Sequence, residues 1–399
     1  MAVVSVSRAR AFLVNCCLLV GTFGLTLGIA EVALRMTAGP DRWSVWPPNL
    51  RVTLHPSAEL LPGLHGPSTF STNSWGLRGG AVPSSPTYTI LAIGGSTTEC
   101  LYLDDSRTWP QLLQQLLNEG GRPGTRVWIG NAGKSGLNSR HNVVQVARLL
   151  SQFPSVDAIL LLVGINDVSY RLAADTTYSP NWRSSPTLER IVGEAFAARP
   201  GSDSALPRYK RTELWRRMRL LRQRLLPEPA EDPIQDLSGT FYARMRELRN
   251  AASRLRDSLP DLTTSLAEYR RNLLEIVGTA QRYGTRVILA TQPTLWDQSM
   301  SARAASLLWF GGVGKFQVTR GSEYYTVPAM IRAMRQYNDE LLSVCNEAAV
   351  ECIDLAAQIP KDTTMFYDDV HFNDGGARRV AEILASYFLA RPPFRGALR

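Results

Sequence analysis

The sequence predicts a three-layer α/β/α domain built on a parallel sheet, preceded by one membrane-spanning helix. Apolar runs of strand length alternate with longer segments whose apolar residues recur at helical spacing, which is typical of a parallel sheet covered by helices on both faces. Several of these runs end in Gly, Ser, Asn or Asp, and open α/β sheets bind ligands at the carboxyl ends of their strands. Residues 11–30 carry no charge and are long enough to cross a membrane once.

The composition is that of a globular protein with one or two domains. The chain has 399 residues, of which 44% are hydrophobic and 20% are charged, so it can bury a substantial core. Its formal net charge of +9 favours acidic partners or anionic lipid head groups. No nucleic-acid motif, metal-ligand spacing or nucleotide fingerprint is present. We therefore expect no nucleic-acid partner, no metal and no cofactor.

The N-terminus predicts a single-pass membrane anchor. We expect residues 1–10 in the cytoplasm, because Arg8 and Arg10 precede the apolar run, and we expect the anchor over residues 11–34. The alternative is a cleaved signal peptide with its cleavage site at residues 28–30. In both cases the rest of the chain lies outside the cytoplasm.

Residues 35–86 form a lead-in segment rich in Pro, Gly, Ser and Trp. Trp43 and Trp46 are expected near the membrane interface, where Trp is favoured. Arg78 has two interpretations, contact with an anionic group of a substrate or packing of the lead-in segment.

The elements of the main domain, residues 87–390, follow in order along the chain. The expected strands cover residues 89–93, 127–129, 158–163 and 351–355, and residues 286–293 are expected to be a further strand with its exit loop. The expected core helices cover residues 109–117, 138–153, 328–349 and 375–389. Residues 391–399 are expected to be a C-terminal tail.

A helical insertion over residues 169–282 interrupts this alternation. Within it, residues 180–204 are expected to be a loop, and residues 208–226 a strongly basic amphipathic helix. Such a helix can lie on an anionic membrane surface or pack on the domain as a solvated helix. Residues 297–328, which include Trp309, are expected to be a second, mobile region near the site.

Four short blocks stand where the predicted strands end or near the C-terminus: Gly94-Gly95-Ser96-Thr97, Asn131-Ala132-Gly133-Lys134-Ser135-Gly136, Gly164-Ile165-Asn166-Asp167 and Asp368-Asp369-Val370-His371. In this order the blocks resemble those of the SGNH/GDSL hydrolase superfamily, over residues 87–168 and 284–390. The resemblance implies a flavodoxin-like sheet and serine ester hydrolysis. Asn73–Gly79 also resembles a segment that precedes the catalytic domain in membrane-anchored members.

A serine nucleophile needs a base, and His371 is the natural candidate for Ser96. Two of the other three histidines lie in the lead-in segment, and His141 lies in a predicted helix, where a surface or packing role is expected. Asp368, three residues before His371, can orient the imidazole. Asp369 is the alternative, and the family's Asp-x-x-His pattern selects Asp368.

The tetrahedral oxyanion formed on ester cleavage needs hydrogen-bond donors. The resemblance implies the backbone N–H of Ser96, the backbone N–H of Gly136 and the side-chain amide of Asn166, with Gly133 as the rival to Gly136. The chain departs from the family at Gly95, where the pattern Gly-Asp-Ser has Asp.

The sequence thus predicts an esterase that deacylates, in particular deacetylates, carbohydrate or cell-envelope substrates outside the cytoplasm. An O-acyltransferase would use the same three side chains, and a non-catalytic envelope scaffold is the third hypothesis. Cys345 and Cys352 can form a disulfide in an oxidising compartment or remain free buried thiols.

Overall fold

The computed structural model contains two compact units. The helical unit comprises Met1–Arg42 and Arg199–Pro233, and the α/β unit comprises Trp43–Ala198 and Ile234–Arg399. The structure describes residues 2–37, 42–84, 87–121, 124, 126–153, 155–200, 207–225, 234–391 and 393–394. Most of the predicted tail, residues 392 and 395–399, lies outside the described residues.

A five-stranded parallel sheet forms the centre of the α/β unit, with the order β4-β3-β5-β7-β9. The strands are β3 (Tyr88–Gly94), β4 (Val127–Asn131), β5 (Ala158–Leu162), β7 (Arg286–Ala290) and β9 (Glu351–Ile353). Residues of β3, β4 and β5 are buried throughout, as expected for a sheet covered on both faces. This is the flavodoxin-like strand order, so the predicted fold class is confirmed.

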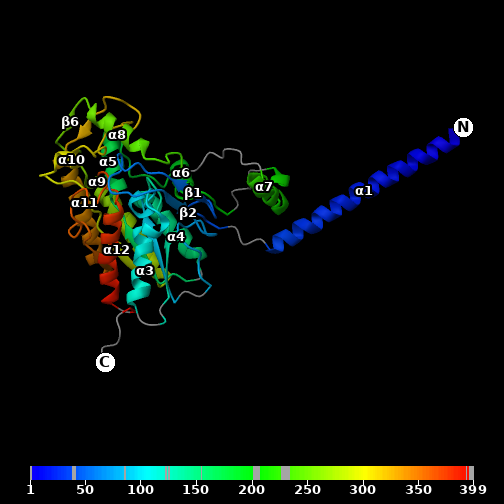
Figure 1. Ribbon diagram of the computed structural model, residues 1–399, viewed down its shortest axis with the longest axis horizontal. Coiled ribbons are helices and arrows are strands. Elements are labelled where there is room, and N and C mark those ends of the chain that lie inside the picture. The colour runs from blue at the N-terminus through cyan, green and yellow to red at the C-terminus, as the bar shows by residue number, and fades with distance from the viewer. Residues whose placement is uncertain are drawn as a thin grey trace. The chain divides into compact units, whose positions relative to one another are not determined.

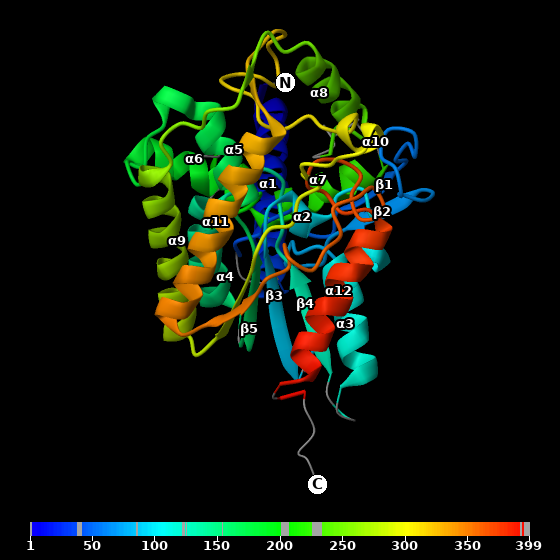
Figure 2. The ribbon, with the colours of Figure 1, turned by 90° about the vertical axis from the view of Figure 1, so that its left-hand side faces the viewer.

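Helices cover both faces of the sheet, as Figure 2 shows. On one face α3 packs against α12, and on the other α9 packs against both α4 and α11. These helices are α3 (Trp109–Gly120), α4 (Ser139–Gln152), α9 (Thr263–Arg282), α11 (Val327–Ala348) and α12 (Asp374–Leu389). Each turns an apolar stripe toward the strands, as α12 does with Val380, Ile383 and Leu384.

From Trp43 onward the lead-in segment belongs to the α/β unit, and it contains the antiparallel pair β1 (Arg51–Leu54) and β2 (Ser68–Ser71). The expectation that Trp43 and Trp46 lie at a membrane interface is wrong for Trp46. Its ring is buried, and its Nε1–H donates to the carbonyl of Gly133 at 3.1 Å. Trp43 is partly buried, with its ring 5.0 Å from that of Phe196. Both rings are used for packing in this unit.

Of the two interpretations of Arg78, the structure supports packing of the lead-in segment. Its guanidinium is buried and donates to the backbone carbonyls of Glu99, Cys100 and Leu103, and it forms an ion pair with Asp105 at 3.0 Å. These bonds hold the lead-in segment against the residues that follow the first core strand.

The region between β5 and β7 is more helical than expected. A loop over residues 180–204 is wrong in part, because α6 (Ser185–Ala195) lies within it. Pro186 occupies the first turn of α6, where proline is tolerated, so the local loop signal was misleading. The other elements here are α5 (Ile165–Ala174), η2 (Asp175–Thr177), α8 (Thr240–Asn250) and β6 (Leu255–Arg256).

The expected mobile region after β7 is instead well packed at its centre. It contains α10 (Ala302–Ala305) and β8 (Tyr324–Tyr325), which pairs in parallel with β6. Trp309 and Phe310 are buried between these elements, at 7% and 3% exposure. Two short segments after Gly94 complete the unit, α2 (Ser96–Glu99) and η1 (Asp105–Arg107).

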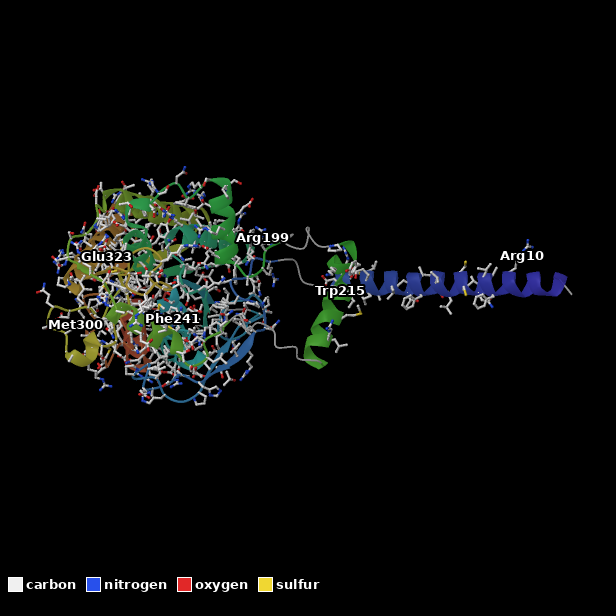
Figure 3. The ribbon with its side chains drawn as sticks, turned by 90° about the horizontal axis from the view of Figure 1, so that it is seen from above. Arg10, Arg199, Trp215, Phe241, Met300 and Glu323 are labelled. Atoms are coloured by element: carbon white, nitrogen blue, oxygen red, sulfur yellow. A yellow bond between two sulfur atoms is a disulfide. The ribbon has the colours of Figure 1, made fainter. Side chains whose placement is uncertain are left out.

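The helical unit contains α1 (Ala2–Thr37), η4 (Arg208–Arg211) and α7 (Glu213–Leu225) (Figure 1). The stretch Arg10–Met36 of α1 is long and apolar enough to cross a membrane, and its side chains project outward along the helix (Figure 3). The predicted basic helix over residues 208–226 is divided into η4 and α7, and Leu226 lies outside the described residues.

Candidate active site

Four segments that follow strands of the sheet meet at its carboxyl edge, and each supplies part of one site. Ser96 follows β3, the loop containing Gly136 follows β4, and Asn166 follows β5. Asp368 and His371 lie between β9 and α12. The parallel arrangement therefore brings together all of the predicted site residues, although they are far apart along the chain.

The turn from β3 into α2 leaves no room for side chains at its two glycines. A Cβ atom on Gly94 would clash with the Thr98 side chain and with the carbonyl of Leu162. A Cβ atom on Gly95 would clash with the amide nitrogen of Asn166. The glycine that replaces the family's Asp is therefore the residue that lets the Asn166 amide lie directly against the turn.

Ser96, His371 and Asp368 form a continuous chain of hydrogen bonds. The Ser96 Oγ lies 2.7 Å from His371 Nε2, and His371 Nδ1 lies 2.7 Å from Asp368 Oδ2. Because a carboxylate only accepts hydrogen bonds, Nδ1 carries the proton and Nε2 is free to accept one from Ser96. The ring of His371 is packed between Tyr367 and Tyr242, at centroid distances of 5.5 and 5.6 Å. This is the arrangement in which a histidine can remove a serine proton.

The Asp368 carboxylate is held by four donors. Oδ1 accepts from the backbone N–H groups of Val370 and His371, and Oδ2 accepts from His371 and from the indole N–H of Trp309 at 3.0 Å. Burial acts to raise the pKa of Asp368, but the charge of His371 and these hydrogen bonds lower it below its usual range. Asp368 therefore stays ionised and available to stabilise an imidazolium.

His371 responds in the opposite direction. Burial acts to lower its pKa, but the charge of Asp368 and their hydrogen bond raise it above the ordinary value, with smaller contributions from Glu99 and Asp369. The site thus favours the protonated imidazole, the form that a general base reaches as it takes the serine proton.

Asp369, the alternative to Asp368, faces away from the imidazole. Its Oδ1 accepts from the indole N–H of Trp296 at 2.7 Å, and its Oδ2 accepts from the backbone N–H groups of Trp309 and Phe310. Burial raises the pKa of Asp369 to about 6. Its bonds fix the segment around Trp309 and leave the contact with His371 Nδ1 to Asp368.

The three residues predicted to supply oxyanion donors, Ser96, Gly136 and Asn166, all line one cavity. Gly136 has a φ of +79°, and an added Cβ would meet no described atom within 4 Å. The Asn166 amide donates to the carbonyl of Leu137 at 2.8 Å through one of its two hydrogens. By contrast, the N–H of the rival Gly133 already donates to the side chain of Asn131 at 2.9 Å. The geometry is compatible with Gly136 and excludes Gly133 in this conformation.

A Gly95→Ala substitution is expected to lower kcat by displacing the Asn166 amide. The loss should approach that of Asn166→Ala, on the order of 10² to 10³ for one oxyanion donor, with KM less affected. Steady-state kinetics on a chromogenic ester would measure it. A matched control is Gly193→Ala in α6, where an added Cβ meets no described atom within 4 Å. Parental kcat in Gly95→Ala would contradict this role of the glycine.

An open cavity of about 580 Å³ lies over Ser96 and His371. Its walls combine aromatic rings with polar and charged groups from five separate segments. The aromatic members are Tyr170, Phe241, Tyr242, Trp309, Phe310 and Phe316, and the polar members include Arg140, His141, Arg190, Glu194, Lys315 and Gln317. A mixed lining of this kind suits a ligand with both apolar faces and hydroxyl groups.

Three residues at or near the site make contacts that the sequence did not predict. Trp309 bonds Asp368, but a lone Trp in a glycine-rich stretch carries no such signal. Glu99 is fully buried behind Ser96 and interacts with Ser135. His141, expected to be a surface or packing residue, is buried against Asn138 and Glu194 at the cavity wall. The spacing of Ser96 and Glu99, one helical turn apart, is the one feature that could have revealed a member of this set.

The other expectations about ligands concern metals and thiols. Among the described ranges, no group of three or more His, Cys, Asp or Glu side chains is placed to hold a metal ion. Cys345 and Cys352, for which two states were considered, are joined in a disulfide.

Comparison with known proteins gives one family. The GDSL-like lipase/acylhydrolase family matches residues 92–257. No curated protein matches the sequence.

Similar solved structures include the acetylxylan esterase Axe2 from Geobacillus stearothermophilus, with 15% identity, a TM-score of 0.38 and coverage of 77% of this chain and 94% of that one. Est24, a carbohydrate acetylesterase from Sinorhizobium meliloti, has 10% identity, a TM-score of 0.39 and coverage of 76% and 99%. A member of the lipolytic protein G-D-S-L family from Veillonella parvula has 12% identity, a TM-score of 0.39 and coverage of 76% and 100%. At these values the similarities carry no argument about substrate.

Proposed function

Because this chain belongs to the GDSL-like lipase/acylhydrolase family, we propose that it is a serine esterase that removes acyl groups, acetyl above all, from carbohydrate or cell-envelope substrates outside the cytoplasm. The observation that carries the proposal is the hydrogen-bond chain from Ser96 through His371 to Asp368 at the floor of an open cavity.

In the proposed reaction Ser96 Oγ attacks the ester carbonyl while His371 Nε2 takes its proton. The N–H groups of Ser96 and Gly136 and the amide of Asn166 stabilise the oxyanion. His371 then gives its proton to the departing alcohol, which leaves an acyl group on Ser96. Water attacks this acyl-enzyme, again with His371 as base, and releases the acid. Asp368 holds Nδ1–H and stabilises the imidazolium at each stage.

The cavity supports a carbohydrate as the alcohol part of the ester. Sugar rings present C–H faces that pack on aromatic rings, and Phe241 and Tyr242 stand in the cavity wall with Trp309. Charged groups such as Arg190 and Glu194 line the same cavity and can bond hydroxyl groups. Both kinds of contact are available close to Ser96.

Two features support a location outside the cytoplasm. The stretch Arg10–Met36 can span a membrane, with Arg10 at the end that basic residues favour in the cytoplasm. The Cys345–Cys352 disulfide is a kind of bond that persists in oxidising compartments. We accordingly place the α/β unit on the extracytoplasmic side of the membrane.

A reporter that is active only after export should be active when fused after residue 40. The reason is the orientation set by Arg8 and Arg10 before the apolar run. A matched reporter that works only in the cytoplasm should be inactive at the same position, and activity of that reporter would overturn the topology. N-terminal sequencing distinguishes an anchor from a signal peptide, because cleavage would release a protein that starts at Glu31.

The contacts of α7 support a role at the membrane surface. The Glu31 carboxylate accepts hydrogen bonds from the N–H groups of Glu213 and Leu214, both at 3.0 Å, and so caps the first turn of α7. At about 1.5 Å per residue, Arg10 to Glu31 spans about 30 Å, the thickness of a bilayer's hydrocarbon core. Glu31 would thus hold the start of α7 at the level where the chain leaves the bilayer.

The composition of α7 suits that position. Its Met218 and Leu221 are exposed, and Arg217 is exposed beside them. Trp215 lies where α7 meets α1 (Figure 3), and Trp is favoured at membrane interfaces. We propose that this helix rests on anionic lipid head groups, with its apolar side chains inserted.

Replacing Arg216, Arg217, Arg219 and Arg222 with Gln should weaken binding of the fragment that starts after α1 to vesicles containing anionic lipid. Each basic residue near such a surface contributes about 1 kcal/mol, and the binding should fall as salt rises. Vesicle co-sedimentation measures it, with neutral vesicles as the control. If the unsubstituted fragment does not bind anionic vesicles, α7 is a solvated helix.

The function itself is tested with aryl esters of increasing acyl length and with acetylated xylo-oligosaccharides. Release of acetate that falls steeply from acetyl to longer chains supports the proposal. Transfer of the acyl group to an unacetylated oligosaccharide, faster than release to water, would identify an acyltransferase. No turnover and no labelling by a fluorophosphonate would leave only a non-catalytic binding role.

A further inference from the structure

A buried carboxylate, Glu99, lies one helical turn after Ser96 in α2, and the proposed mechanism does not use it. Its side chain is 1% exposed, although burying an ionisable group costs free energy unless partners compensate. Its neighbour Arg78 spends its donors on backbone carbonyls, including that of Glu99 itself, and on Asp105. The role of Glu99 can therefore be inferred from the groups that its carboxylate contacts.

The partner of the Glu99 carboxylate is Ser135, the residue directly before Gly136. The Ser135 hydroxyl donates to Glu99 Oε2, and the Ser135 backbone N–H also bonds the carboxylate. Ser135 itself lines the cavity. The buried Glu99 side chain thus holds the residue that directly precedes the candidate oxyanion donor in the cavity wall.

The rest of this loop is fixed on either side of Ser135 and Gly136. On one side the N–H of Gly133 donates to Asn131, whose amide donates to the carbonyl of Thr98 at 2.8 Å. On the other side the carbonyl of Leu137 accepts from Asn166. Gly136, at φ +79°, has no side chain to anchor it. The N–H of Leu137 also donates to the carbonyl of Lys134 at 3.3 Å, which closes a turn around Ser135 and Gly136. The bonds from Ser135 to Glu99 anchor this turn from the protein interior and so contribute to the direction of the Gly136 N–H.

We propose that Glu99 is a positioning residue of this active site, which fixes Gly136 through Ser135 and places a negative charge behind His371. The inference rests on the proposed esterase function and deepens it. Both effects would act in the same step of the reaction, because the oxyanion and the imidazolium form together.

The charged and titratable groups around Glu99 come from every element packed against it. Arg78 of the lead-in segment, Lys134 of the Gly133–Gly136 loop and His371 provide positive charge. Tyr102 and Tyr242 are the neutral titratable neighbours. Burial raises the pKa of Glu99 to about 7, against the opposing effects of Ser135, Arg78 and His371. Glu99 is therefore mostly ionised only above about pH 7, and in that form its charge raises the pKa of His371.

The test compares Glu99→Gln, Glu99→Leu and Ser135→Ala with the parent, in the full-length protein. Glu99→Leu removes the acceptor and should lower kcat by about 10- to 100-fold with little change in KM, less than the loss of a whole donor. Ser135→Ala keeps the backbone N–H and should lose less. Glu99→Gln keeps an acceptor for Ser135, so its kcat should stay within a few-fold of the parent.

The pH profile separates positioning by charge from a purely structural role. The neutral form of His371 is the base, so kcat/KM falls as pH drops through its pKa. Removing the Glu99 charge lowers that pKa, so the acid limb of Glu99→Gln should move to lower pH. A residue that only supports the fold would lower the plateau and leave the limb in place.

Glu351→Gln is the matched control, because this carboxylate bonds Arg286 and Tyr387 at the start of β9, the opposite end of the strand from the site. Its acid limb should match that of the parent. Parental kcat in Ser135→Ala together with an unmoved limb in Glu99→Gln would overturn the inference, even if Glu99→Leu fails to fold. A parent that neither turns over esters nor reacts with a fluorophosphonate would instead overturn the proposed function.

Discussion

Ser96→Ala is expected to abolish covalent labelling by a fluorophosphonate and to remove nearly all ester turnover. The probe reacts with an activated serine, and the Ser96 Oγ is the hydroxyl that lies 2.7 Å from His371 Nε2. Loss of a triad serine typically costs on the order of 10⁶ in kcat, and what remains comes from the oxyanion donors and binding. Gel fluorescence after labelling and turnover of an aryl acetate measure the two effects.

The substitution should leave the fold intact, because Ser96 is only partly buried and alanine fits the first turn of α2. Circular dichroism of the variant should therefore match that of the parent. Ser169→Ala is the labelling control, because Ser169 also lines the cavity but lies in α5, outside the hydrogen-bond chain from Ser96 through His371 to Asp368. A folded Ser96→Ala protein with parental turnover would refute the assignment of the nucleophile.

His371→Ala should cost about as much turnover as Ser96→Ala, since members of a triad are strongly non-additive. Asp368→Asn should cost less, on the order of 10⁴. An amide at this position can turn only one oxygen toward its four present donors, so either the backbone N–H groups or His371 and Trp309 would face an NH₂ group. The imidazole would then favour the tautomer that cannot accept a proton from Ser96.

The acid limb of the parent enzyme's kcat/KM against pH gives an independent measure of the interaction between Asp368 and His371. Asp368 raises the pKa of His371, so the limb should lie at higher pH than it would for an unperturbed histidine. Asp369→Asn is the comparison, because that carboxylate bonds Trp296, Trp309 and Phe310 and makes no contact with Nδ1. Asp369→Asn should therefore retain far more turnover than Asp368→Asn. The reverse order would reassign the orienting residue.

The location of the enzyme matters for interpreting these experiments. Fragments that begin after α1 retain the whole α/β unit together with α7, and the Cys345–Cys352 disulfide ties the end of α11 to β9 within the α/β unit. Preparations made under reducing conditions would lack this link. Assays of activity and stability should therefore use oxidised protein.

The sequence by itself determined the fold class, the order of the core strands along the chain and the presence of an apolar span. These follow from local patterns: a short uninterrupted apolar run such as residues 158–163, followed directly by Gly164, is typical of a buried strand. The resemblance to the SGNH/GDSL hydrolases also selected the four blocks of candidate site residues from the sequence, and three of them follow parallel strands, whose carboxyl ends lie at one edge of the sheet. The candidate residues Ser96, Asn166 and His371 needed no coordinates to be named.

Only the tertiary structure decided what long-range contacts do with these residues. Gly133 and Gly136 look alike in the sequence, but the N–H of Gly133 is used by Asn131, and nothing local shows this. Nothing in the sequence around Trp46 or Trp309 indicates its partner. In the structure Trp46 donates a hydrogen bond to the loop after β4, and Trp309 donates one to Asp368. The physical reason is that a hydrogen bond between residues far apart in the chain depends on how the layers pack. Periodicity within one element carries no information about that packing.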